Sequence, residues 1–596
     1  YSREKLKGDI ETLESFYRDR GYLKFSIESS QISLSRDKKL IFITFNVNEG
    51  EKYTINDVDV VGEIPFDEDV YIDIVNRLKD TTYSQAQITS IEEFFTNVLG
   101  NRGYAFAEVV GNPEINEVTN EVKLIFSVQP GNRTYTRKIL FTGNDITQDY
   151  VLRREMRQFE GAWTSDNSIE AGKVRLERLG YFKEVNVETI PVPGTEDQID
   201  IVYSVEEETT GSVGGNIGYS DFGLMLGFNL QEQNFLGSGN TVGIGINKNI
   251  YSEMYNISYM NPYATRDAVS LGYNVFFRET DYGEFNVANY LTNSNGFGAQ
   301  FGYPISDISR LGFNITYDKT DIDIGTLPAR EIYDFVSVEG NIFETLTAQL
   351  SWQQVTLNRG LFPTDGASTV VSFSSTIPGS DLSYYRFNIR QRYYQPLSSD
   401  FVFGFQGEIG YLDSYGDTEE IPFFQNFYAG GPRSLRGFES NTLGPRSTDA
   451  PCYEFNYEEG TCPNLIDTDG DGEADAPYLN PYANQGQRSR YRDAPIGGNI
   501  KVEGSLQLIF RLPFIEDQRS LRSAFFFDFG NVFSDNCKEY QINCSELSVD
   551  ELRYSYGVGI TWITGFGPMS LAIAKPTNAG PLERTEEFQF TVGNVF

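Results

Sequence analysis

The chain has 596 residues, which is too long for one ordinary domain and predicts at least two folding units. Its 48 basic and 84 acidic residues leave a net charge of -36, which argues against a nucleic-acid partner because phosphates require a basic face. The sequence contains no histidine, the commonest general base, and no nucleophile stands beside a plausible base. We therefore expect neither catalytic residues nor an enzymatic activity.

The first third of the chain repeats a short motif. A Gly-Tyr pair recurs about every 80 residues, beginning at Gly21, Gly103 and Gly180, and such a period is typical of a tandem domain array. The pattern of each repeat predicts a strand, two amphipathic helices and two further strands. In the second repeat, Ser84 is the expected N-cap of a helix and Gly103 its C-cap. The first repeat lacks its opening strand and helix because the chain begins at Tyr1, so we expect more repeats upstream.

From Gly211 to Phe596 the helical pattern disappears. Segments of about ten residues alternate apolar with polar side chains, as the strands of a transmembrane barrel do. No window of about 18 apolar residues occurs, which excludes an ordinary transmembrane helix. At about 24 residues per strand and connection, the region predicts a 16-stranded antiparallel transmembrane β-barrel behind the α+β repeats.

The first and last strands must pair to close this barrel. The first is rich in glycine and offers few side chains for packing, whereas the last alternates aromatic residues. We expect this seam to be the weakest join of the barrel. Its residues are Gly211, Gly214, Gly215 and Gly218 on one strand, and Phe588, Phe590, Gly593 and Phe596 on the other.

A glycine-rich loop segment, "YAGGPRSLRGF", presents Arg436 beside Gly437 and Phe438. Far along the chain, in "SAFFFDFGNVF", alternate phenylalanines face outward, so Asp528 and Gly530 face the barrel interior. A carboxylate on such a strand needs a cation, and an arginine fork fits it well. The alternation makes Asp528 a candidate partner for Arg436, and a solvated loop charge is the alternative for this arginine.

Four cysteines lie in two close pairs within polar segments. This spacing predicts two loop disulfides, Cys452 with Cys462 and Cys537 with Cys544, and an oxidising compartment; unpaired thiols are the alternative. Between the pairs, "DTDGDGEAD" follows the first part of a calcium loop, but Tyr478 replaces the bidentate glutamate at its last position. A weak structural calcium site and a flexible acidic loop are both open; its ligands would be Asp467, Asp469, Asp471 and Asp475. We expect no other cofactor.

The tandem repeats, a barrel of this length, "LRGF" inside "FYAGGPRSLRGF" and the aromatic last strand together resemble the BamA family of outer-membrane insertases. The segments "YSREKLKGDIETLESFYRDRGY", "VLRREMRQFEGAW", "LFPTDG" and "TIPGSDLSYY" carry the same resemblance. In that family polypeptide-transport-associated (POTRA) domains precede a 16-stranded barrel, and the loop that carries LRGF folds back into the lumen, where its arginine meets acidic residues of the inner wall. The resemblance thus implies that Arg436 reaches Asp528. The implied boundaries are 1–51 for the C-terminal half of the third POTRA domain, 52–130 for the fourth, 131–208 for the fifth and 209–596 for the barrel, with a long extracellular loop near 430–500.

The resemblance also implies a function and partners. The chain would be the central subunit of the outer-membrane β-barrel assembly machinery of a Gram-negative bacterium, with its POTRA domains in the periplasm. Clients would be held by POTRA strand addition and released through the seam. Arg153 and Glu160 match positions that dock the lipoprotein BamD. Further expected partners are the lipoproteins BamB, BamC and BamE, unfolded outer-membrane clients, periplasmic chaperones and outer-membrane lipids.

One position departs from the family, and two other functions stay open. The family usually has a glutamate where this chain has Gln507, which faces inward between two lipid-facing leucines and could accept a hydrogen bond from Arg436 without adding charge. The strongest alternative function is a secretion or translocation pore of the two-partner or TamA-like type. A passive porin is the second, and a lumen filled by the loop around Arg436 would argue against it.

Overall fold

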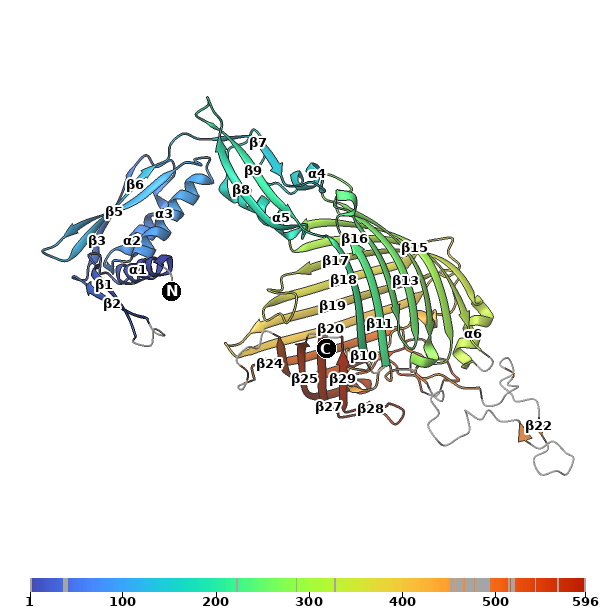
Figure 1. Cartoon of the computed structure of the whole chain (residues 1–596). Helices are drawn as coiled ribbons and strands as arrows, with labels where there is room; N and C mark the ends of the chain where they lie inside the picture. Colours follow the sequence, from blue (N-terminus) through green and yellow to red (C-terminus); the bar gives the residue numbers. More distant parts are fainter. Residues whose placement is uncertain are drawn as a thin grey trace. The chain divides into compact units, whose positions relative to one another are not determined.

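The computed structural model describes residues 3–35, 41–220, 223–285, 287–325, 328–450, 456, 465–466, 476–477, 494–512, 515, 520–541, 543–564 and 567–593. The chain forms two compact units, which are described separately (Figure 1). The first comprises residues 1–210 together with Leu236–Ser238, and the second comprises the rest. Among the described residues, no helix combines the length and the apolar content that a membrane crossing requires.

The first unit begins with a partial repeat. Helix α1 (Arg3–Arg18) packs on a two-stranded antiparallel sheet of β1 (Ser26–Leu34) and β2 (Ile41–Asn48). Tyr17 on the helix stacks on Phe25 with ring centroids 4.1 Å apart. This helix followed by two strands is the second half of the repeat that the sequence predicts.

The second repeat is complete. It contains β3 (Thr54–Gly62), η1 (Glu68–Val70), α2 (Ile72–Leu78), β4 (Thr81–Thr82), α3 (Gln85–Gly100), β5 (Glu108–Asn116) and β6 (Glu121–Gln129). The strands lie in the order β4-β3-β6-β5, so the two-residue β4 extends the expected three-stranded sheet. Ser84 caps α3 by accepting from the Gln87 amide, and Gly103 adopts a φ of 98° just after the helix ends. Phe95 and Phe126, fully buried, join the helix to the sheet.

The third repeat has the same order of elements. It contains β7 (Tyr135–Thr142), α4 (Asp149–Arg153), α5 (Asp166–Arg178), β8 (Phe182–Pro191) and β9 (Gln198–Glu207). Its sheet has the order β7-β9-β8, and β7 and β9 are parallel. Leu176 and Tyr203 are fully buried in its core. Strands β5 and β8 therefore each form one edge of their sheets.

The second unit is a closed antiparallel barrel of 16 strands within the described part of the chain, as predicted (Figure 1). Each strand pairs with the next along the chain, and β29 returns to β10. The strands are β10 (Gly211–Ser220), β11 (Gly223–Glu232), β12 (Thr241–Lys248), β13 (Ser252–Asn261), β14 (Ser270–Asp281), β15 (Leu291–Ser306), β16 (Ser309–Asp323), β17 (Ile342–Val355), β18 (Gly366–Thr376), β19 (Tyr384–Pro396), β20 (Phe401–Ser414), β24 (Ile500–Phe510), β25 (Leu521–Phe533), β26 (Arg553–Thr564), β27 (Gly567–Pro576) and β29 (Phe588–Val592).

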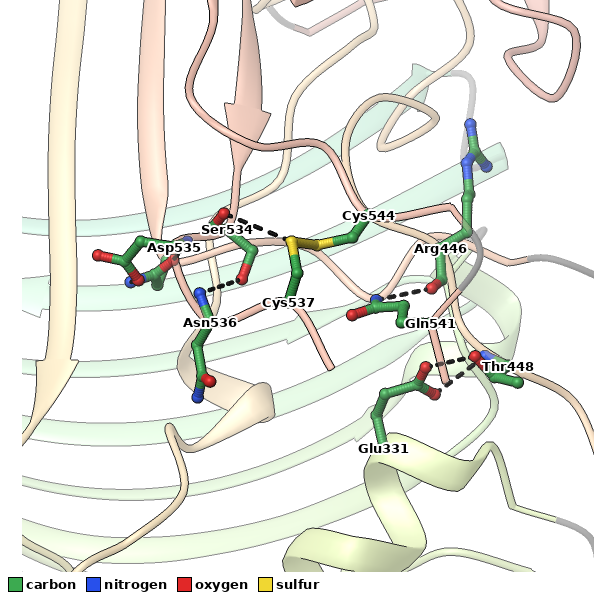
Figure 2. Close-up of a disulfide and its surroundings, with 10 residues drawn as sticks. Glu331, Arg446, Thr448, Ser534, Asp535, Asn536, Cys537, Gln541 and Cys544 are labelled. Atoms are coloured by element: carbon green, nitrogen blue, oxygen red, sulfur yellow. Dashed lines mark hydrogen bonds between the residues drawn. A yellow bond between two sulfur atoms is a disulfide. The ribbon is translucent and has the colours of Figure 1, made fainter. Parts of the chain in front are cut away.

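The barrel region also contains a helix, which corrects the expectation that helical structure ends at Gly211. Helix α6 (Arg330–Glu339) lies in the connection between β16 and β17. Ile332 and Phe335, three residues apart, bury one face of it. Glu331 accepts hydrogen bonds from the amide (2.9 Å) and the hydroxyl (2.7 Å) of Thr448, and burial raises the pKa of this carboxyl (Figure 2). The β-branched and aromatic residues of α6 are also common in strands, and the helix is only ten residues long. The helical period is therefore hard to recognise in the sequence.

Candidate functional site

Arg436 lies in the barrel interior and forms a bidentate ion pair with Asp528. Its Nε is 2.7 Å from Oδ2 of Asp528 and its Nη2 is 2.6 Å from Oδ1, while the backbone amide of Arg436 also donates to Oδ2 at 3.2 Å. The guanidinium carbon lies 3.4 Å from the centroid of the Phe526 ring. Arg436 is 5% exposed and Asp528 is fully buried, so the structure brings together the two residues that the sequence pairs.

The position of Asp528 follows from the alternation of β25. Phe525 and Phe527 are 51% and 40% exposed on the outer face, whereas Phe526 and Asp528 are buried on the inner face. Gly530 also faces inward, where a Cβ atom would lie 2.4 Å from the carbonyl oxygen of Val502 on β24. Glycine is therefore required there by the close approach of the two strands.

Gln507 does not take the role expected of it. The third partner of Arg436 is Ser505, whose Oγ accepts from Nη2 at 2.8 Å. Gln507 instead donates to the same Ser505 hydroxyl at 3.3 Å, so Ser505 lies between Gln507 and Arg436 in the hydrogen-bond network. Ser505 lies opposite Asp528 in the register of β24 and β25, which only the pairing of the two strands reveals.

The loop that carries Arg436, residues 427–438 and called the arginine loop below, also holds the last strand of the barrel. Gly437 and Phe438 form β21, which pairs with β28 (Thr585–Glu586) just ahead of β29. On β29 itself, Gln589 donates to the carbonyl oxygen of Phe438 at 2.8 Å and accepts from the amide of Gly437 at 3.3 Å. Gly437 has a φ of 90°, and a Cβ there would lie 3.1 Å from Ala574. Gln589 was not predicted from the sequence, although its place between Phe588 and Phe590 on an alternating strand turns its side chain inward.

The seam between β10 and β29 has one pair among the described residues. All ten residues of β10 pair with β11, and Tyr219 pairs with Val592 of β29. β29 is short and makes five pairs with β27. Within the described part of the last strand, which ends at Gly593, β29 therefore contacts β10 near one end of β10.

The glycines of the seam differ in their surroundings. A Cβ atom on Gly218 would lie 3.0 Å from the carbonyl oxygen of Val592, and one on Gly593 would lie 3.3 Å from the Gly218 Cα, so these two permit the strands to meet. Cβ atoms on Gly211 and Gly214 would instead meet side chains of β11, and one on Gly215 would meet open space. Phe588 is 59% exposed and Phe590 is partly buried, while Phe596 lies outside the described residues.

Arg153 and Glu160, the predicted docking pair, contact each other in the third repeat. Nη1 of Arg153 lies 3.1 Å from Oε1 of Glu160, and Nε lies 3.0 Å from Asp149. The pair also holds the backbone of Ile139 on β7: Arg153 donates to its carbonyl oxygen, and Glu160 accepts from its amide. Both side chains are nearly half exposed, so they can still be reached by a partner.

The connection between β25 and β26 is closed by the predicted disulfide between Cys537 and Cys544 (Figure 2). Within the closed segment, Gln541 donates to the carbonyl oxygen of Arg446 at 3.0 Å. The disulfide thereby supports the chain that follows the arginine loop. The other predicted pair, Cys452 with Cys462, and the calcium-loop aspartates Asp467, Asp469, Asp471 and Asp475 lie outside the described residues.

Comparison with known proteins gives a consistent result. The Omp85 superfamily domain matches residues 234–596, and the POTRA model, described as a surface antigen variable number repeat, matches residues 1–50, 53–131 and 134–208. The outer membrane protein assembly factor BamA of Neisseria meningitidis is 29% identical over all of this chain and 73% of its own length. That of Buchnera aphidicola is 31% identical over 58% of each chain.

A solved structure shares the fold. The crystal structure of BamA from Haemophilus ducreyi lacking POTRA domains 1-3 superposes with a TM-score of 0.75 at 31% identity, over 91% of this chain and 99% of that one. Because the superfamily domain covers more than half of the sequence and the repeat model covers most of the rest, the chain belongs to the Omp85 superfamily of POTRA and β-barrel proteins.

Proposed function

We propose that the chain folds β-barrel proteins and inserts them into the outer membrane of a Gram-negative bacterium, as the central subunit of an assembly machinery. The observation that carries the proposal is the seam, where, among the described residues, β10 makes ten pairs with β11 and one with β29. Relatives named as outer membrane protein assembly factors support it. In this proposal the barrel spans the outer membrane and the repeats lie in the periplasm.

The work at the seam is physical rather than chemical. An unpaired strand edge is a template for another extended segment, so a client strand can add to β10 where β29 leaves it free. Successive client strands can then pair before they meet lipid. Each unsatisfied backbone group in the bilayer would cost several kcal/mol, and pairing at the seam avoids that cost. The proposal requires no catalytic residue and no cofactor.

The repeats offer a second kind of edge. Strands β5 and β8 each close one side of a sheet, and each is long enough, at nine and ten residues, to accept an extended client by strand addition. We propose that the repeats hold unfolded clients, and the chaperones that deliver them, before insertion.

The packing of the arginine loop favours insertion over export through the lumen. Phe427, Leu435 and Phe438 of the loop belong to one buried cluster with Leu412 and Val532 of the barrel wall. A translocation pore or a porin would need this path to be clear, whereas release through the wall leaves the loop in place.

The test is reconstitution of the whole chain in liposomes, followed by addition of an unfolded eight-stranded outer-membrane protein. Folding of the client, read from its gel mobility without heating, should be at least about tenfold faster than in protein-free liposomes, which corresponds to about 1.4 kcal/mol of barrier. Equal rates in the two preparations would contradict the function.

Arg153 supplies a prediction on partners. We propose that it docks a lipoprotein subunit together with Glu160, by analogy with the family. Arg153→Glu places three carboxylates together and should weaken capture of the lipoprotein by about tenfold, measured by co-purification of the complex. Arg178→Glu, an exposed change on α5 of the same repeat, is the matched control and should leave capture unchanged. Equal capture by both variants would place the docking surface elsewhere.

A further inference from the structure

A cavity of about 830 Å³ lies inside one end of the barrel, within the second unit. Its walls come from the connections that follow β17, β19 and β24, and from inward positions such as Val402 and Ile509. Because successive strands alternate in direction, these connections lie at the end where β10 begins. The volume is within the range of pockets that hold small ligands or short peptide segments, about 300 to 1,000 Å³.

Three arginines line this cavity, Arg359, Arg511 and Arg522, against one carboxylate, Asp400, among its described residues. None of the three forms an ion pair with a carboxylate in the part of the chain that the structure describes. Several other cations of the barrel do form ion pairs: Arg436 contacts Asp528, and Lys501 and Arg553 contact glutamates. The described lining of this cavity therefore carries more positive than negative charge.

Arg522 is held in place by rings rather than by acids. Its guanidinium carbon lies 4.7 Å from the centroid of Tyr394 and 6.0 Å from that of Phe362, and Nη2 reaches the carbonyl oxygen of Pro363 at 3.5 Å. Arg359, on the connection after β17, donates to the Thr364 hydroxyl at 3.2 Å. A guanidinium has five N–H donors, so these contacts orient the two side chains and leave donors for a ligand.

We propose that this cavity binds a ligand that carries a carboxylate beside an apolar group. The planar arginine forks match a carboxylate in two parallel hydrogen bonds, and the apolar wall, which includes Phe362, Val402 and Ile509, receives the rest of the ligand. The carboxylate can belong to a small free acid or to an acidic residue within a peptide segment. The inference concerns this cavity alone and does not depend on the seam or on insertase activity.

Calorimetric titration of the whole chain in detergent micelles tests the proposal with four probes: N-acetylphenylalanine, its amide, an acidic tripeptide and inorganic phosphate. N-acetylphenylalanine should bind, and its amide, which has the same ring without the charge, should not. Acetyl-Phe-Glu-Phe-amide separates the two sources: binding of this peptide assigns the site to acidic peptide segments, and binding of the free amino acid derivative alone assigns it to small acids.

Arg522→Gln and Arg359→Gln should each weaken the binding of N-acetylphenylalanine by about tenfold or more, since each removes a hydrogen-bond donor to a charged group. Arg359 is exposed on a connection, so its variant remains informative where Arg522→Gln fails to fold. Arg310→Gln, an exposed arginine at the same end of the barrel and outside the cavity, is the matched control and should bind normally. Equal binding of the acid and the amide, binding unaffected by both variants, or binding of inorganic phosphate in place of the carboxylate would overturn the proposal.

Discussion

Replacing Arg436 by alanine should lower the free energy of unfolding of the barrel by about 3–5 kcal/mol, the usual cost of breaking a buried ion pair. Asp528 is fully buried and receives three hydrogen bonds from Arg436, two from its guanidinium and one from its amide. Without the guanidinium, this carboxylate stays on an inner wall among phenylalanines with no cation to neutralise it. The substitution also frees the loop that holds β29 through Gln589.

The effect can be read from gel mobility, because a folded barrel migrates differently from the heated chain. The temperature at which the folded band disappears should fall by roughly 5–10 °C for Arg436→Ala. Arg433→Ala, three residues earlier in the same loop and exposed, should leave that temperature unchanged. The double variant Arg436→Ala with Asp528→Asn should recover part of the loss, because it removes the uncompensated charge. An unchanged temperature for Arg436→Ala would make the arginine a dispensable loop charge.

Period-two alternation was sufficient to predict much of this site. The exposed phenylalanines of β25 placed Asp528 inside the barrel, and a buried carboxylate called for an arginine. The repeats of the first unit could also be predicted from the sequence, because each Gly-Tyr motif lies at the end of a helix and before a pair of strands. These features depend on residues close together in the chain, which a sequence displays directly.

The contacts that the sequence did not predict depend on register and on the path of the loop. Ser505, rather than Gln507, contacts Arg436 because it lies opposite Asp528 in the pairing of β24 with β25. A register shift of one residue would move the inward side chains of the shifted strand to its outer face. Gln589 contacts the loop across 151 positions of sequence, which no local pattern reports. Likewise, the pairing of Val592 with Tyr219 joins the two ends of the barrel sequence, which no local pattern reports.

Linking the seam covalently should stop client folding. Tyr219 and Val592 are directly opposite each other, and opposed residues of antiparallel strands have Cα atoms about 4.5–5.5 Å apart, a separation that a disulfide can span. With Tyr219→Cys and Val592→Cys joined, β10 and β29 cannot part, so a client strand that adds to β10 cannot extend between the two strands. Folding should fall to the rate seen in protein-free liposomes.

A matched disulfide separates this effect from the general stiffening of the barrel. Phe313→Cys with Leu350→Cys joins β16 to β17 at an opposed pair that is far from the seam in the strand order of the barrel. Oxidation of this control should leave client folding unchanged. Carrying it through the same oxidation and reduction also accounts for cleavage of the native disulfide between Cys537 and Cys544.

The most direct measurement is the rate of client folding in liposomes that contain the Tyr219→Cys, Val592→Cys chain, before and after reduction of the seam disulfide. Insertion through the seam predicts that folding stops on oxidation and returns on reduction, while the control pair between β16 and β17 has no effect in either state. Equal folding rates with the seam oxidised and reduced would contradict insertion between β10 and β29.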